Sequence, residues 1–194
     1  GATTIPLTEI FAESDLGDEL EVVSIDTTNT KGVVTIGSII YDANGAFDFL
    51  KPGETATDTF GVTARDQFGA QGSGFYTLVI NGVNDAPEAR DDSYFAVAGQ
   101  AISATVGGGL LSNDSDPEAD ALRIIVSETK GPDHGTLSLG QQGAFQYTPE
   151  TGFEGTDSFT YTITDGELAD TAVVRIIVDL TNDAPVTSPD FYTV

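Results

Sequence analysis

Residues 158–164 read Ser-Phe-Thr-Tyr-Thr-Ile-Thr, in which large apolar side chains alternate with hydroxyl side chains. The apolar positions are Phe159, Tyr161 and Ile163. Successive side chains of an extended chain point to opposite faces, so this alternation predicts a strand with one buried face. Residues 59–65, Thr-Phe-Gly-Val-Thr-Ala-Arg, alternate in the same way. Both stretches are therefore predicted to be strands of sheets that cover an apolar core.

The segments around these stretches carry further strand signals. Val173–Asp179 and Tyr76–Ile80 are apolar at most positions, which predicts central strands buried on both faces. Phe47–Phe49 and Phe145–Tyr147 mark a strand that precedes each alternating strand. Turn residues separate these segments, and no segment has a helical period. About seven short strands per repeating unit are typical of a Greek-key β-sandwich of the cadherin or immunoglobulin type.

Several short motifs recur after 98 or 99 residues. They are Gly45-Ala-Phe47 and Gly143-Ala-Phe145, Asp58-Thr-Phe60 and Asp157-Ser-Phe159, and Asn84-Asp-Ala-Pro87 and Asn182-Asp-Ala-Pro185. Asp190-Phe-Tyr192 also repeats Asp92-Ser-Tyr94, so a third copy starts near the C-terminus. The sequence therefore predicts an all-β fold of two tandem sandwiches. We expect a first repeat over 1–84 that lacks part of its first strand, a second over 85–183, and a truncated third over 184–194.

The amino-acid composition limits the kinds of partner that the chain can bind. It contains 31 Asp and Glu residues against 7 Lys and Arg, which gives a formal net charge of −24. Phosphate groups repel such a chain, so we expect no binding to nucleic acid and no insertion into membranes. The absence of cysteine excludes disulfides and thiolate metal sites. Small extracellular domains without disulfides commonly use a metal ion instead.

The acidic residues gather in the predicted turns, as in Ser14–Glu19 and Asn113–Asp120. Calcium prefers six to eight oxygen ligands from carboxylates and carbonyls on loops. The spacing Asp114-x-Asp116 lets two carboxylates of an extended loop point the same way. Turn formation alone explains any single Asp or Asn, but acids in register across two repeats favour calcium sites.

Together these motifs resemble the bacterial cadherin-like and VCBS-type tandem repeats of large RTX-type surface adhesins. The resemblance covers nearly the whole chain and rests on the Asn-Asp-Ala-Pro linkers, the Ser-Asp turns, Gly-Ala-Phe, Gly155-x-Asp-Ser-Phe-x-Tyr161 and the closing Asp165-Gly166. It implies extracellular β-sandwiches at the bacterial surface that bind Ca²⁺ and act as extender or adhesive modules. Neighbouring repeats of the same chain would be their first partners.

A more distant similarity to animal cadherins implies where the ions bind, namely at the junctions between repeats. The junction inside this chain would use Glu54, Asn84, Asp85, Asp114, Asp116 and Asp165, with Asp58 as an addition. A junction with a preceding repeat would use Asp15, Asp18 and Asp66. A junction with the third repeat would use Glu154, Asp179, Asn182 and Asp183. Ca²⁺ would stiffen linkers whose carboxylates otherwise repel one another.

Two other functions compete with that of an extender. An enzyme is disfavoured, because the single histidine, His134, lies in a predicted turn and Gly107–Gly109 is not followed by the Lys-Ser/Thr of a phosphate loop. A calcium-dependent carbohydrate-binding module is the alternative, although the chain has no tryptophan for a sugar platform. Glycans and homophilic contacts therefore stay open as further partners.

Overall fold

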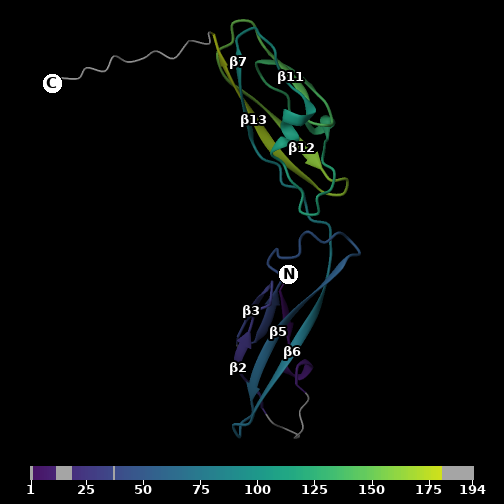
Figure 1. The fold of residues 1–194 in the computed structure, drawn as a ribbon. Helices are drawn as coiled ribbons and strands as arrows, with labels where there is room; N and C mark the ends of the chain where they lie inside the picture. Colours follow the sequence, from purple (N-terminus) through teal and green to yellow (C-terminus); the bar gives the residue numbers. More distant parts are fainter. Residues whose placement is uncertain (1, 12–18, 37, 181–194) are drawn as a thin grey trace, which may run out of the picture. The chain divides into compact units, whose positions relative to one another are not determined.

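The computed structural model of the chain describes residues 2–11, 19–36 and 38–180 (Figure 1). Within these residues the regular elements are thirteen strands and four 3-10 helices of three residues each. The predicted all-β fold is confirmed. Contacts divide the chain into two compact units, Gly1–Asp85 and Ala86–Val194, and each unit has its own buried cluster of apolar side chains.

Unit 1 contains two three-stranded sheets among its described residues. One sheet has the order β1-β4-β3 and consists of Thr3–Ile5, Ile39–Asp42 and Val33–Thr35. The other has the order β2-β5-β6 and consists of Glu21–Asp26, Thr55–Arg65 and Gln71–Asn81. The 3-10 helix η1 spans Leu7–Glu9. Both sheets contribute to one core, formed by Ile5, Ile39, Tyr41, Phe60 and Val62.

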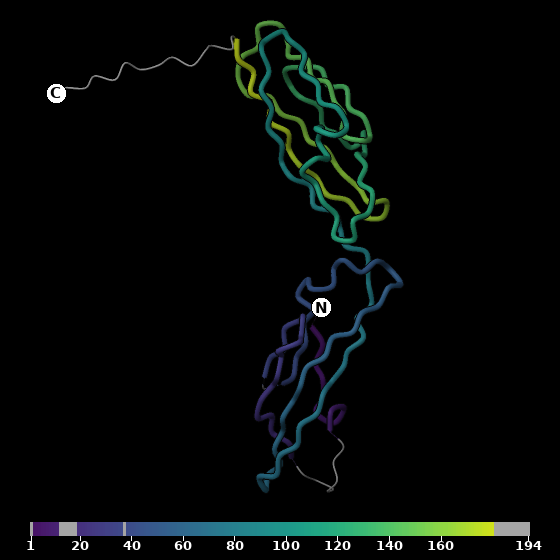
Figure 2. Tube along the Cα trace, in the orientation of Figure 1, coloured from purple at the N-terminus to yellow at the C-terminus, as the bar shows by residue number. Residues whose placement is uncertain are grey.

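Unit 2 contains a four-stranded and a three-stranded sheet. The first has the order β7-β13-β12-β9 and consists of Asp92–Val97, Ala169–Asp179, Gly155–Thr164 and Arg123–Ile124. The second has the order β10-β11-β8 and consists of Gly135–Leu139, Phe145–Pro149 and Ile102–Ala104. The 3-10 helices η2, η3 and η4 span Val106–Gly108, Leu110–Ser112 and Val126–Glu128. β7 and β13 are far apart in sequence but run side by side in parallel (Figure 2).

The alternation in residues 158–164 corresponds to a strand with one buried face, as predicted. Phe159, Tyr161 and Ile163 are fully buried in β12 and pack with side chains of both sheets of unit 2. Phe159 pairs with Val174 across to β13, just as Phe60 of unit 1 pairs with Tyr76 across to β6. β5–β6 and β12–β13 are thus equivalent hairpins in the two units.

Burial of the second strand of each hairpin differs from the prediction. β13 is central in its sheet, but only its inward side chains are buried, namely Ala172, Val174, Ile176 and Val178. β6 pairs only with β5 among the described residues, so it is an edge strand. Its side chains alternate between half-buried and exposed. The prediction of burial on both faces is wrong, because each sheet of a sandwich has one face on the core and one in solvent.

The predicted strand at Phe47–Phe49 is also wrong. Residues 44–49 form turns, and Asn44 and Gly45 adopt left-handed conformations with φ of 47° and 77°. Such conformations end a strand, and asparagine and glycine tolerate them best. The strand lies earlier, at Ile39–Asp42, so the counterpart of Tyr147 in unit 1 is Tyr41.

Candidate functional site

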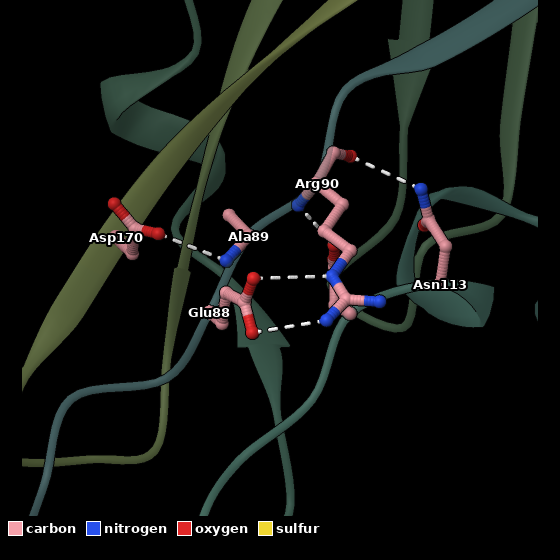
Figure 3. Close-up of polar contacts among 6 residues, drawn as sticks. Glu88, Ala89, Arg90, Asn113 and Asp170 are labelled. Atoms are coloured by element: carbon pink, nitrogen blue, oxygen red, sulfur yellow. Dashed lines mark hydrogen bonds and ion pairs between the residues drawn. The ribbon is translucent and has the colours of Figure 1, made fainter.

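The chain enters unit 2 beside the acidic loop that contains Asp114. Glu88 and Ser115 exchange two backbone hydrogen bonds, with N···O distances of 2.8 and 3.1 Å. The Arg90 amide donates to Asp114 Oδ1 at 2.8 Å. Asn113 Nδ2 donates to the Arg90 carbonyl at 3.1 Å (Figure 3). The segment that follows the first Asn-Asp-Ala-Pro linker is therefore fixed to this loop.

Two further aspartates join the entering segment to strand β13, namely Asp170 on β13 and Asp91 on the entering segment. The Ala89 amide donates to Asp170 Oδ2 at 2.9 Å (Figure 3). Asp91 Oδ1 accepts from the Val173 amide at 2.9 Å, and Asp91 Oδ2 lies 3.3 Å from Arg175 Nη1. We refer to the carboxylates gathered at this end of unit 2 as the acidic cluster, which consists of Asp91, Asp92, Asp114, Asp116 and Asp170.

The hydroxyl group of Tyr161 faces more hydrogen-bond acceptors than it can serve. Asp92 Oδ2 lies 3.1 Å from it, and the two carboxylate oxygens of Asp114 lie 3.1 and 3.2 Å away. The carbonyl oxygens of Arg90 and Leu110 lie at 3.0 and 3.3 Å. A phenol has one proton to donate, and the Tyr161 side chain is fully buried. This surplus of oxygen acceptors is an arrangement that a bound cation would relieve.

The same crowding appears in the pKa values of the cluster. Burial raises the pKa of Asp92 to about 6, the charges of Asp114 and Asp91 add to the rise, and the Tyr161 hydrogen bond opposes it. Burial likewise raises the pKa of Asp114, where the charge of Asp170 adds to the rise and the Arg90 amide opposes it. Each ionised carboxylate thus makes ionisation of its neighbours more costly.

Asp116 offers a second set of oxygen atoms on the same loop. Its Oδ1 accepts from the amides of Glu118 and Asp120 at 3.1 and 2.9 Å, which shapes the turn. Its Oδ2 is buried and has no hydrogen-bond partner among the described residues, and the same holds for Asn113 Oδ1. Buried polar atoms without a partner are uncommon in folded proteins. Both atoms are of the kind that calcium prefers.

The acidic cluster is not a closed coordination shell. Among residues 2–11, 19–36 and 38–180, no three Asp, Glu or His side chains are grouped so that they could hold one metal ion. The acidic cluster offers carboxylate oxygens, and amide and carbonyl oxygens lie beside it. These oxygen atoms fit a hard cation such as Ca²⁺, which does not need sulfur or imidazole ligands.

The structure locates most of the residues predicted as ligands. Glu54 Oε2 accepts from the Lys51 amide at 3.0 Å, and the Glu54 carbonyl accepts from Gly82 at 2.9 Å, so Glu54 lies next to the start of the linker. Asn84 Nδ2 donates to the Asp85 carbonyl at 3.3 Å. Three unit 2 ligands were predicted for the junction inside this chain, and two of them, Asp114 and Asp116, lie on one loop of the acidic cluster. The junction between repeats stays a prediction.

Other predicted ligands lie at the ends of strands. Asp66 Oδ1 accepts from the amides of Phe68 and Ala70, and Asp165 Oδ1 accepts from those of Glu167 and Leu168. These two aspartates therefore shape the turns after β5 and β12. Glu154 directly precedes β12, and the carbonyl of Asp179 at the end of β13 accepts from Ala98. Four predicted ligands lie outside the described residues, namely Asp15, Asp18, Asn182 and Asp183.

Asp58 is engaged in the core of unit 1. It is 3% exposed and accepts from the amides of Lys31, Gly32 and Thr59 and from the Tyr41 hydroxyl at 2.8 Å. Burial alone would raise the pKa of Asp58, but these hydrogen bonds outweigh it and lower the pKa. Since both of its oxygens already have donors, Asp58 has the environment of a structural carboxylate.

Sequence reasoning missed Asp91, Asp92 and Asp170. A signal existed for Asp92, which recurs 98 residues later as Asp190 in the motif Asp-x-Tyr. No such repeat signal existed for Asp170, because Gly72 stands at the equivalent place in the first repeat. The hydroxyl of Tyr161 is also specific to unit 2.

The second half of the chain matches a known protein family. The model of a family described as bacterial cadherin-like domain matches residues 84–180, half of the chain. The chain belongs to this family. The resemblance to bacterial cadherin-like domains read from the linkers and turn motifs is thereby confirmed. Cadherin-like domains are extracellular modules of adhesion type that contact neighbouring repeats and typically bind Ca²⁺. No helix among the described residues of this cadherin-like chain is long and apolar enough to cross a membrane.

Similar solved structures include two cadherins and an enzyme. Drosophila N-cadherin EC1–3 has 16% identity and a TM-score of 0.37, over 85% of this chain and 56% of that chain. Human protocadherin-24 EC1–2 has 12% identity and a TM-score of 0.38, over 90% of this chain and 87% of that chain. An endo-fucoidan hydrolase of glycoside hydrolase family 107 has 17% identity and a TM-score of 0.36, over 84% of this chain. The chain spans only 24% of that hydrolase. Such scores transfer no function, and no curated protein matches the chain.

Proposed function

We propose that the chain is a calcium-binding extender module of a bacterial cell-surface or secreted adhesin, in which Ca²⁺ stiffens the linker between repeats. The observation that carries this proposal is the surplus of acceptors around the buried Tyr161 hydroxyl, where Asp92 and Asp114 share one proton donor. Family membership supports the same role, since cadherin-like domains typically bind Ca²⁺.

The candidate ligands come from the acidic loop and the segment that enters unit 2. They are Asp92, Asn113, Asp114 and Asp116, with Glu54, Asn84 and Asp85 as the contribution expected from the first repeat and the linker. Bound Ca²⁺ supplies positive charge that offsets the repulsion among these carboxylates. Asp58 is left out, because its oxygens already accept hydrogen bonds from the core of unit 1.

The contacts of the entering segment explain how ion binding would reach the linker. Glu88 and Arg90 are hydrogen-bonded to Ser115 and Asp114, so any tightening of the acidic loop is transmitted to the residues directly after Pro87. Without a cation, we expect repulsion among the ionised carboxylates of the acidic cluster to weaken these contacts. Extracellular calcium modules commonly bind with Kd of about 10⁻⁴–10⁻³ M, which suits a module that responds to its surroundings.

Thermal unfolding in EGTA, in millimolar calcium and in equal magnesium tests the proposal. Binding to the folded state alone, at a calcium concentration of about 10 Kd, adds about 1.4 kcal/mol to the free energy of unfolding. We expect a calcium-selective rise in Tm. Asp116→Asn should abolish most of this rise, because it removes a charge but keeps the Oδ1 acceptor that shapes the turn.

Asp133→Asn is the matched control, because it removes one charge from an exposed residue in the turn before β10. Its calcium-dependent rise in Tm should equal that of the unaltered chain. Identical melting curves of the unaltered chain in all three buffers would show that the acids only solubilise the protein, and the proposal would be abandoned.

A second candidate function, carbohydrate binding, has one observation in its favour. The Phe75 side chain on β6 is 79% exposed, and a notch of about 70 Å³ beside it is lined by Asp26, Asn29, Thr59 and Gly61. An exposed ring next to carboxylate, amide and hydroxyl groups suits a sugar. A glycan array decides the matter, because a pure extender binds nothing, whereas glycan binding should be lost in Phe75→Ala and kept in Phe68→Ala.

The proposed role involves no catalysis. The His134 ring stacks on Phe153 with a centroid distance of 4.3 Å, and its Nδ1 lies 3.9 Å from Glu150 Oε2. The His134 amide donates to Asp157. These contacts support a structural role for His134 at the start of β10.

A further inference from the structure

Strands β7 and β13 of unit 2 are neighbours that run in the same direction. They pair in parallel from Asp92 opposite Val174 to Val97 opposite Asp179. The Ala98 amide then donates to the Asp179 carbonyl at 2.8 Å. The linker leads into the start of β7, and the chain passes on from the end of β13 (Figure 2). The two connections of unit 2 therefore lie at opposite ends of one ladder of hydrogen bonds.

Two aspartate side chains extend this ladder toward the linker. Asp91 Oδ1 accepts from the Val173 amide at 2.9 Å, one position before the first backbone pair. Asp91 Oδ2 lies 3.3 Å from Arg175 Nη1. Asp170 of β13 accepts from the Ala89 amide at 2.9 Å. Hydrogen bonds to charged groups are stronger than those between neutral groups, so the residues that lead into β7 are also held to β13.

The direction of the two strands determines how unit 2 responds to tension. A force on its two connections pulls β7 toward the linker and β13 away from it, so the strands are loaded along their length. The hydrogen bonds of a parallel pair are evenly spaced, so they share this load and must break almost together. A force on two neighbouring strand ends instead opens such a ladder one pair at a time.

Strand β13 is a firm partner for β7 under such a load. β13 is central in its sheet, and it also pairs with β12 along the whole length of Gly155–Thr164. Its inward side chains Val174, Ile176 and Val178 are fully buried in the core. Sliding of β7 along β13 is therefore not relieved by a shift of β13 itself.

We propose that unit 2 bears mechanical load along the chain, and that the β7–β13 ladder with the side chains of Asp91 and Asp170 is the clamp that keeps it folded under tension. The clamp consists of hydrogen bonds and one ion pair within unit 2, so it does not require bound calcium. Forced unfolding is governed by the unfolding rate and not by the free energy of unfolding. Resistance to force should therefore depend on the direction of the pull.

Single-molecule force spectroscopy of the full chain tests the proposal. The chain has no cysteine, so two introduced cysteines define where the force acts. Ala86→Cys with Leu180→Cys loads the ladder along its length. Gln100→Cys with Leu180→Cys opens it from the end at which Val97 faces Asp179. All three replaced residues are exposed and lie in unit 2, so unit 1 carries no force. We expect a several-fold higher rupture force for the first cysteine pair.

Asp91→Ala tests the contribution of the side chains, because it removes the contacts with Val173 and Arg175. It should lower the rupture force of the first cysteine pair. The force of the second pair should not change, since opening from the far end breaks these contacts last. A general loss of stability would lower both forces. Asp133→Ala is the matched control, since it removes an exposed carboxylate outside the clamp and should change neither force.

All of these measurements are made in EGTA, so their result is independent of calcium binding. Equal rupture forces for the two cysteine pairs would overturn the proposal. A rupture force of the first pair that Asp91→Ala leaves unchanged would overturn the role of the side chains. The comparison of the two cysteine pairs retains every residue of the clamp, so it decides the matter even if Asp91→Ala fails to fold.

Discussion

At the scale of single residues, each unit is organised around one buried carboxylate. Asp157 accepts from the amides of Asp133, His134 and Ser158 and from the Tyr147 hydroxyl, and Asp58 has the equivalent partners in unit 1. The recurrence of both aspartates was visible in the sequence. Their role was not, because two of the three amide donors to each carboxylate lie 23 to 27 residues away along the chain.

Replacing this carboxylate tests its structural role. Asp157→Asn exchanges an acceptor oxygen for a donor NH₂ group and leaves buried amides without partners. We expect the free energy of unfolding of unit 2 to fall by roughly 2–4 kcal/mol in urea denaturation. Tyr147→Phe removes one hydrogen bond from the same carboxylate and should cost about 1–2 kcal/mol. Equal stability of Asp157→Asn and the unaltered chain would contradict this role.

The same residue predicts a dependence of stability on pH. Burial tends to raise the pKa of Asp157, but the hydrogen bonds from Tyr147 and the three amides outweigh it, so the folded pKa lies below the ordinary value of 3.8. A lowered pKa stabilises the fold above pH 3.8, and this stability is lost as the pH falls through the folded pKa. Urea denaturation from pH 5 to pH 2.5 should therefore show a steeper decline for the unaltered chain than for Asp157→Asn. Parallel curves would refute this linkage.

At the scale of elements, alternation predicted the hairpin strands but not their neighbours. Residues 59–65 and 158–164 were placed correctly, because a period of two is a local property. The edge position of β6 could not be read in the same way, since pairing depends on a strand far away in sequence. The strand predicted at Phe47–Phe49 is a turn, although Gly45 before it and Gly143 before β11 have similar left-handed φ values of 77° and 82°.

The β10–β11 hairpin contains a glycine whose role follows from packing. A Cβ atom on Gly135 would collide with the Tyr147 ring, and one on Gly32 would meet the Tyr41 ring in the equivalent hairpin. Gly135→Ala should displace the tyrosine from Asp157 and lower the free energy of unfolding by roughly 1–3 kcal/mol. Gly131→Ala is the control, because its Cβ would meet no atom within 4 Å. Equal stability of the two variants in urea denaturation would refute this packing argument.

At the scale of the whole molecule, the repeat is visible in the hairpins more than in the acidic side chains. Motifs 98 or 99 residues apart correspond to equivalent hairpins in two compact units. The acidic cluster is less symmetric, since Tyr161 is replaced in the first repeat by Val62 and Asp170 by Gly72. Repeats that share a fold thus differ in the oxygen atoms that they gather, and only coordinates reveal which side chains converge.

Stiffening of the linker can be separated from calcium binding itself. Val83 in the linker is 65% exposed, so an elastase-type protease that acts in EGTA should cut the chain after it. We expect calcium to slow cleavage at this site, located by mass spectrometry of the fragments. The protection should persist in Asp133→Asn and vanish in Asp116→Asn. The opposite outcome is a Tm that rises with calcium while the linker is cleaved at an unchanged rate. The chain would then bind the ion without stiffening the junction. The extender mechanism would fail, although the calcium site would remain.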